Sequence, residues 1–118
     1  MEDDLGALQR AAVAFRDARD WQQFHRPKDL ALGLAAEAGE LVERFLWKSD
    51  REMEALARPG APRDGLGEEM ADVLLFLLYL AEWSGLDLAE ATRRKLALNA
   101  EKYPVDKARG TARKYTDL

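Results

Sequence analysis

Apolar residues in this chain of 118 residues recur at the three- and four-residue spacing of helices, and no segment alternates as a strand does. Turn signals divide the pattern into four main helices, over residues 3–19, 29–48, 68–83 and 87–102. Residues 20–27 connect the first two helices, and residues 49–67 form a loop with a short helix near 51–57. We therefore expect an all-α fold, a four-helix bundle of one domain over residues 1–118 with a basic tail at 105–118.

The second and third helices are apolar on more than one face. Beyond their main stripes they carry Leu32, Val42 and Leu46 on the second helix, and Leu74, Leu75, Leu77 and Leu78 on the third. A helix that is apolar all round is buried on all sides, which a chain this short achieves through a subunit interface. We expect a homo-oligomer, either a dimer or a tetramer.

Composition excludes several classes of function. The chain has no cysteine and one histidine, His25, which excludes thiolate zinc sites, cysteine nucleophiles and paired-histidine sites within one subunit. Its net charge of −4 argues against binding to polymeric nucleic acid. The longest apolar run, residues 73–81, is shorter than the roughly 20 residues of a membrane span, and the acidic N-terminus lacks a signal pattern. We expect a cytoplasmic protein that does not bind membranes.

Two predicted helices each place two acids, three residues apart, among their apolar residues. Glu37 lies within the stripe of the second helix and Glu40 at its edge, and Glu69 and Asp72 share the apolar sector of the third. Four inward carboxylates need cations, and an oxygen-only donor set favours Mg²⁺, with Mn²⁺ as a substitute. In the alternative, structural interpretation, acids near the start of the third helix suit its dipole, and arginines in a solvated groove neutralise either pair.

The fourth predicted helix carries the opposite charge. Lys95, Asn99 and Lys102 share one stripe, which suits the binding of a polyphosphate, although a solvated lysine face is the alternative. Together with metal ions, such lysines are what an acidic protein needs to bind a nucleoside triphosphate.

Aromatic residues flank the second helix. Trp21, His25 and Trp47 suit stacking on a base or bonding to its edge. The alternatives are core packing for Trp47 and capping or filling of the connecting loop for His25. For the basic tail, disorder and a flap that closes over phosphates are both compatible with the sequence.

Three motifs together resemble those of the MazG-like all-α nucleoside triphosphate pyrophosphohydrolases. They are Glu37-Ala-Gly-Glu40, Glu69-Met-Ala-Asp72 and Lys95-x-x-x-Asn99-x-x-Lys102-Tyr103-Pro104. Two further segments resemble the dCTP pyrophosphatase branch, Arg19-Asp20-Trp21-x-Gln23-Phe24-His25 and Ala108-Arg109-Gly110-x-x-Arg113-Lys114-Tyr115-Thr116. The resemblance extends from about Phe15 to Leu118.

This resemblance implies a Mg²⁺-dependent enzyme that cleaves the α–β phosphoanhydride of a nucleoside triphosphate, releasing the monophosphate and pyrophosphate. It implies metal ligands at Glu37, Glu40, Glu69 and Asp72, with one glutamate orienting the attacking water. It also implies phosphate or sugar contacts from Lys95, Asn99, Lys102 and Tyr103, and a base pocket bordered by Trp21, His25 and Trp47. Members of this branch resemble helical tetramers whose active sites lie near subunit boundaries. The resemblance therefore implies a dimer of dimers.

Two other functions fit the same residues. The same groove suits a non-catalytic helical oligomer that binds a nucleotide or a partner helix, and the acids suit a metal hydrolase that acts on a different phosphoanhydride. The preferred base also stays open, because the branch often carries a histidine where this chain has Ala12.

Overall fold

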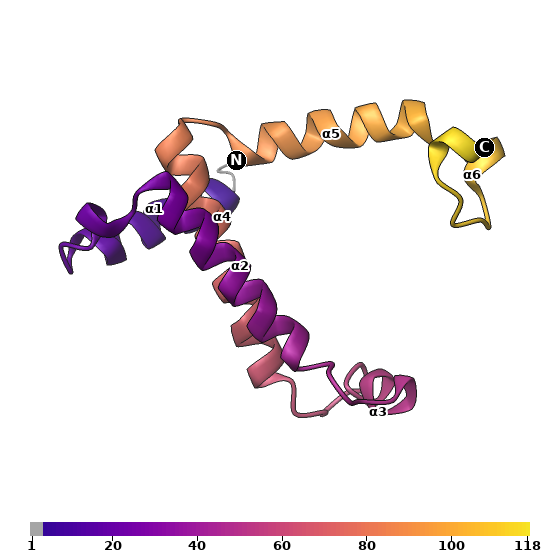
Figure 1. Cartoon of the computed structure of the whole chain (residues 1–118), viewed down its shortest axis with the longest axis horizontal. Coiled ribbons are helices and arrows are strands. Elements are labelled where there is room, and N and C mark those ends of the chain that lie inside the picture. The colour runs from indigo at the N-terminus through magenta and orange to yellow at the C-terminus, as the bar shows by residue number, and fades with distance from the viewer. Residues whose placement is uncertain (1–3) are drawn as a thin grey trace.

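The computed structural model describes residues 4–118, and within them the chain is all-α, as the sequence predicts (Figure 1). The elements are α1 (Asp4–Asp17), η1 (Gln22–Phe24), α2 (Pro27–Glu43), α3 (Asp50–Ala55), α4 (Asp64–Ser84), α5 (Leu88–Lys102), α6 (Val105–Ala108) and η2 (Tyr115–Asp117), where η marks a 3₁₀ helix. The four long helices α1, α2, α4 and α5 correspond to the four predicted ones. The expected start of the first helix at residue 3 lies outside the described residues, and this helix ends at Asp17 instead of Arg19.

The start of α2 lies two residues before the predicted cap. Pro27 lies in the first turn, where backbone N–H groups have no partner within the helix, so the N–H that proline lacks costs no hydrogen bond. Arg26 before it is extended, with φ −81° and ψ 150°. Asp29 therefore lies inside the first turn, where its charge suits the helix dipole, and the prediction that it caps the helix is wrong.

The end of α2 also comes earlier than the apolar pattern predicts. The N–H of Arg44 donates to the carbonyl of Leu41, a tightened last turn, and Trp47 has a left-handed φ of 62°. The helix consequently ends at Glu43, and its predicted continuation to residue 47 or 48 is wrong.

The short helix predicted near residues 51–57 is present as α3. Ser49 caps it, since its hydroxyl accepts from the N–H of Glu52 at 3.1 Å and the Glu52 carboxylate accepts from the N–H of Ser49 at 3.5 Å. This capping box explains why a helix of only six residues forms within an otherwise irregular segment.

The longest helix, α4, begins at Asp64 rather than at the predicted Glu68. Gly65 and Gly67 are poor helix formers, and for this reason the predicted helix starts after them. In the structure the N–H of Gly67 already donates to the carbonyl of Arg63, so both glycines belong to the first turn. As predicted, α4 stops at Gly85, which has a left-handed φ of 71°. Although α4 is strongly apolar, neither it nor any other helix in the described part of the chain has the length and hydrophobicity to cross a membrane.

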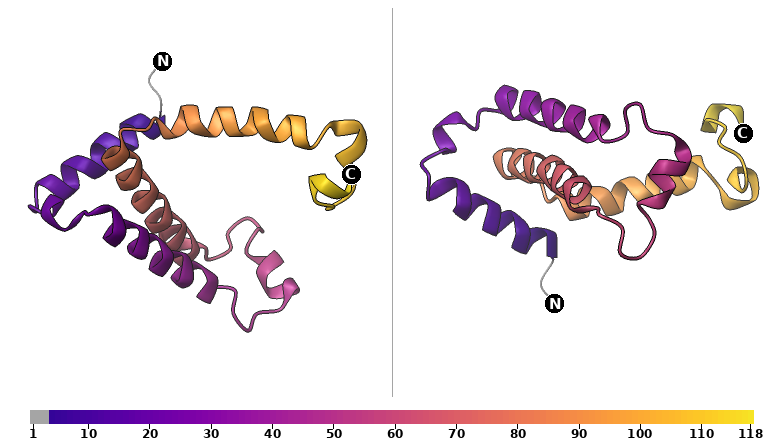
Figure 2. Two further views of the ribbon diagram at one scale, coloured as in Figure 1. Left: turned by 45° about the horizontal axis from the view of Figure 1, so that its top comes forward. Right: turned by 90° about the horizontal axis from the view of Figure 1, so that it is seen from below.

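The core lies where α1 and α2 pack against α4, which runs between them in the right-hand view of Figure 2. Leu30 of α2 and Tyr79 of α4 are buried together with Ala12 of α1, and the Tyr79 hydroxyl donates to the Ala12 carbonyl at 3.0 Å. Arg16 of α1 is only 3% exposed and donates to the Glu82 carboxylate of α4 at 3.0 Å. A buried, ion-paired arginine thus joins α1 to the C-terminal end of α4.

The fourth long helix does not close a bundle within one chain. After Gly85 the extended backbone of Asp87 directs the chain outward, and α5 runs away from α2 and α4 with its main contact on α1 (Figures 1 and 2). The radius of gyration is 17.8 Å, against about 13.5 Å for a compact domain of this length. Several large apolar residues of α2, α4 and α5 each keep more than a third of their own surface exposed. They are Leu32, Val42, Leu75, Leu77, Leu96 and Leu98.

The contact between α2 and α4 can be tested with a pair of glycines on α2. A Cβ at Gly33 would lie 2.6 Å from Cζ of Phe76, whereas a Cβ at Gly39 would meet nothing within 4 Å. We expect Gly33→Ala to lower the free energy of unfolding by about 1–2 kcal/mol, because overpacking outweighs the gain in helix propensity. We expect Gly39→Ala to raise it by up to about 1 kcal/mol. Urea unfolding at one protein concentration measures both, and equal stabilisation by the two changes would contradict the contact.

Candidate functional site

The four predicted acids converge between α2 and α4. One carboxylate oxygen from each of Glu37, Glu40, Glu69 and Asp72 lies within 4.8 Å of the other three. Each pair is three residues apart, so both members share a helix face, and the two faces meet because α2 and α4 pack along one another. We call these four residues the acid cluster.

The acid cluster is partly withdrawn from water. Glu37 and Glu69 are half-buried. Glu40 is exposed at the rim, in agreement with its predicted place at the edge of the apolar stripe, so it does not face inward as Glu37 and Glu69 do. The Oε2 atoms of both Glu37 and Glu69 are buried without a hydrogen-bond partner. A buried carboxylate oxygen left unpaired is costly, so both atoms favour a proton, a cation or a bound water as a partner.

Contacts within the acid cluster raise the pKa of Glu40. A hydrogen bond with Glu37 and the negative charge of that residue raise the pKa of Glu40 above its ordinary value. The charge of Asp72 acts in the same direction, whereas a hydrogen bond with Glu69 opposes it. Glu40 therefore takes up a proton more readily than an ordinary glutamate when no cation is near.

The donor set fits a hard divalent ion. Carboxylate oxygens are the preferred ligands of Mg²⁺ and Mn²⁺, and two buried oxygens here have no other partner. The single histidine of the chain lies before α2, at the other end of that helix from the acid cluster, so it adds no nitrogen ligand within one chain.

One cation already contacts the acid cluster. Nη2 of Arg44 lies 3.5 Å from Oε1 of Glu69, and among residues 4–118 it is the one arginine or lysine ion-paired with these acids. Neutralisation by arginine, the structural alternative, thus applies to one acid of the four. Sequence reasoning missed Arg44, although it lies seven residues after Glu37 and therefore on the same face of the chain as the acids.

The predicted phosphate-binding residues lie elsewhere in the chain. Lys95, Asn99 and Lys102 follow one another along α5, and Tyr103 comes directly after it. The acid cluster includes Glu69 and Asp72 of α4, whereas α5 starts beyond the opposite end of that helix, which lies about 18–23 Å further along the helix axis. In the part of the chain that is described, no ion pair links the α5 lysines to the acid cluster.

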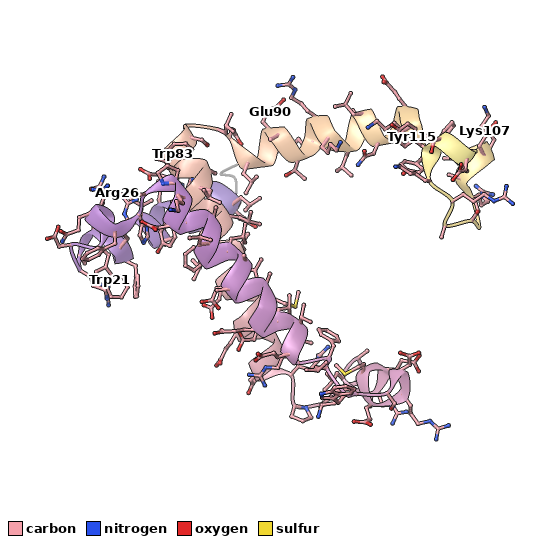
Figure 3. All side chains as sticks on the ribbon, in the orientation of Figure 1. Trp21, Arg26, Trp83, Glu90, Lys107 and Tyr115 are labelled. Atoms are coloured by element: carbon pink, nitrogen blue, oxygen red, sulfur yellow. The ribbon has the colours of Figure 1, made fainter. Side chains whose placement is uncertain are left out.

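The basic tail folds back on the end of α5. The Tyr115 ring meets that of Tyr103 edge to face, with centroids 6.0 Å apart, and Nζ of Lys102 lies 5.0 Å from the Tyr115 centroid. Figure 3 shows Tyr115 and Lys107 together at the far end of α5. In this arrangement the tail adopts helical turns against its own helix and lies away from the acid cluster.

The three predicted base-pocket residues are not gathered in one place. Trp21 and His25 lie before the start of α2 and Trp47 follows its end, so a helix of 17 residues, about 25 Å long, separates them. Trp21 is 45% exposed, and Figure 3 shows it at the outer edge of the molecule. Trp47 is 91% exposed, so core packing does not account for it.

His25 behaves mainly as a packed residue. Its ring centroid lies 4.5 Å from that of Tyr79, and its Nδ1 atom is buried without a hydrogen-bond partner. Burial, together with the nearby charge of Arg16, lowers the pKa of His25, so the imidazole is neutral at pH 7. Within a single chain, His25 therefore fills the connecting loop by packing on Tyr79, as the structural alternative predicts.

Comparison with known proteins agrees with these features. The sequence model of the MazG-like family matches residues 34–118. The dCTP pyrophosphatase 1 proteins of Mus musculus and Homo sapiens are 45% and 41% identical over 117 residues, which cover 99% of this chain and 69% of each relative. A pyrophosphatase crystal structure from Archaeoglobus fulgidus superposes with a TM-score of 0.76 at 38% identity, covering 88% of this chain and 95% of that one.

Charge repulsion in the acid cluster gives a prediction for Glu40→Gln. In the presence of EDTA we expect this variant to melt at a higher temperature than the wild type, because one of four converging negative charges is gone. We also expect MgCl₂ to raise its melting temperature less than that of the wild type, because one carboxylate of the candidate metal site is lost. Thermal melts with chelator and with magnesium measure both effects.

Glu43→Gln is the matched control, since Glu43 lies on the same helix but outside the acid cluster. It should respond to magnesium as the wild type does. An equal magnesium response of Glu40→Gln and the wild type would remove Glu40 from the metal site.

Proposed function

The chain belongs to the MazG-like family, and from that premise we propose that it cleaves the bond between the α- and β-phosphates of dCTP or a modified dCTP. The products are the nucleoside monophosphate and pyrophosphate. That the chain is a deoxynucleoside triphosphate pyrophosphohydrolase follows from its pyrophosphatase relatives in sequence and structure. The cytosine base is proposed from the names of the relatives.

The observation that carries the proposal is the convergence of four carboxylates with two unpartnered buried oxygens. We propose that Glu37, Glu40, Glu69 and Asp72 hold Mg²⁺, for which Mn²⁺ can substitute. When bound, the ion supplies positive charge to the phosphate oxygens and makes water a stronger nucleophile. The exposed rim at Glu40 leaves this centre open to a substrate, and a glutamate of the acid cluster orients the attacking water by accepting its hydrogen bond.

The remaining phosphate charge calls for more cations than Arg44, the one that a single chain pairs with the acid cluster. We propose that α5 of a second copy supplies them, through Lys95, Lys102, Asn99 and Tyr103, in a dimer or a dimer of dimers. The outward course of α5, the large radius of gyration and the exposed leucines of α2 and α4 support this assembly. A second copy packed on these faces also completes the four-helix arrangement that one chain leaves open.

The base pocket is proposed on the same basis. Trp47 has an exposed indole and a left-handed backbone, and it follows the end of α2 that carries Glu37 and Glu40, where it offers a stacking face. Trp21 and His25 border the same base only if another copy brings them there, because α2 separates them from Trp47 in one chain.

A non-catalytic helical oligomer that binds a nucleotide through the acidic groove is the rival function. It shares the fold and the acid cluster but releases no product. Incubation with each dNTP and Mg²⁺, with and without EDTA, separates the two functions by the appearance of pyrophosphate. Release of phosphate and a nucleoside diphosphate instead would indicate a different phosphoanhydride hydrolase.

We expect Glu40→Gln and Asp72→Asn each to lower turnover of dCTP by at least about 10²-fold at saturating Mg²⁺, while the oligomer persists. Each change removes one carboxylate from the acid cluster but keeps the size of the side chain. Chromatography of the nucleotide products measures the rate, and light scattering measures the assembly. Near-normal hydrolysis by both variants would refute the assignment.

If the acids and the lysines of one site come from two copies of the chain, two inactive variants should complement each other in a mixed oligomer. We expect Asp72→Asn and the double variant Lys95→Ala, Lys102→Ala to be nearly inactive alone, and co-expressed mixed oligomers to regain activity. In a mixed oligomer, one copy retains its acids and the other retains its lysines, which restores a complete site. Activity of the purified mixed oligomers no greater than the sum of the two separate variants would place the lysines and acids of one chain in the same site.

A further inference from the structure

Arg44 occupies a special position beside the acid cluster. It follows the last residue of α2 and reaches across to α4, where Nη2 lies 3.5 Å from Oε1 of Glu69. The other oxygen of this carboxylate, Oε2, is buried without a partner. One carboxylate group therefore has a cation on its outer side and an open acceptor on its other oxygen.

A glycine allows this placement. A Cβ at Gly65 would lie 2.6 Å from Nη1, 2.7 Å from Cζ and 2.8 Å from Nη2 of Arg44, so the guanidinium rests directly on the backbone of the first turn of α4. Any side chain at residue 65 would displace the guanidinium or be displaced by it. Gly67, two residues on in the same helix, has nothing within 4 Å of its own Cβ position.

Arg44 affects a bound divalent ion in two opposite ways. Holding Oε1 orients the Glu69 carboxylate, which favours metal binding, whereas a positive charge beside a ligand repels the metal. The orienting contact is weak, since the pair is 3.5 Å apart and the Arg44 side chain is 48% exposed. Repulsion between a single and a double positive charge acts over a longer range and does not depend on hydrogen-bond geometry. The repulsion is therefore the larger effect.

We infer that Arg44 is a counter-cation of the acid cluster that competes with the divalent ion, so that a residue outside the ligand set lowers the affinity of the site for metal. The inference rests on the proposed function in taking the acid cluster as the metal site. Arg44 neutralises part of the cluster charge when no ion is bound, and its charge opposes the ion that replaces it.

Binding of Mn²⁺ to the metal-free full chain tests the inference without substrate, through the electron paramagnetic resonance signal of free Mn²⁺. We expect Arg44→Leu to bind Mn²⁺ about three- to tenfold more tightly than the wild type, with a gain that shrinks as salt screens the charges. Arg44→Lys keeps the charge and should restore most of the wild-type affinity.

The two glycines provide a matched pair for the same measurement. Gly65→Ala should shift the affinity in the direction of Arg44→Leu, because the new methyl group takes the place of the guanidinium, and Gly67→Ala should leave it unchanged. A merely structural role of Arg44 would weaken Mn²⁺ binding in Arg44→Leu. Weaker or unchanged binding by that variant therefore overturns the inference.

Failure of the inference is distinguishable from failure of the proposed function. If the wild type hydrolyses dCTP but Arg44→Leu does not bind Mn²⁺ more tightly, the inference alone is wrong. If Arg44→Leu binds Mn²⁺ more tightly but the wild type hydrolyses no dNTP, the inference stands and the proposed reaction is wrong.

Discussion

Four like charges held close together by two packed helices are the constraint on which the rest of this structure depends. Carboxylate oxygens within 4.8 Å of one another repel, and the fold tolerates them because α2 and α4 are fixed by a core that lies further along the helices. The bonds from Tyr79 and Arg16 to α1 and α4 stabilise that core at the opposite end. The core residues that stabilise the fold and the acids of the candidate site therefore lie at different ends of the α2–α4 pair.

Helix periodicity was sufficient to predict the class of fold and the meeting of the acids. Two acids three residues apart share a face in any helix, and two such faces that also carry apolar residues come together when the helices pack. The helix ends were less predictable. α2 stops short because Trp47 adopts a left-handed backbone, and α4 starts early although Gly65 disfavours helix. Both departures accompany irregular backbone that residue spacing does not encode.

The periodicity of apolar residues also does not predict the direction that a helix takes after a turn. The stripe of Lys95, Asn99 and Lys102 is visible in the sequence, but the backbone at Gly85 and Asp87 decides that it points away from the acids. The distance between Trp21 and Trp47 is likewise set by the length of α2, which keeps these two predicted base-pocket residues at its opposite ends. Arg44 went unnoticed because its partners, Glu69 and Gly65, are distant in sequence.

The outward course of α5, if it serves a neighbouring copy as proposed, makes the activity per chain depend on the concentration of the protein. With its lysines supplied to a neighbouring copy, as proposed, each chain on its own carries the acidic half of one centre and the basic half of another. Assembly obeys mass action, so on dilution both halves persist intact while the number of whole centres falls faster than the number of chains. A cell holding few copies would then have disproportionately little turnover, without any regulator.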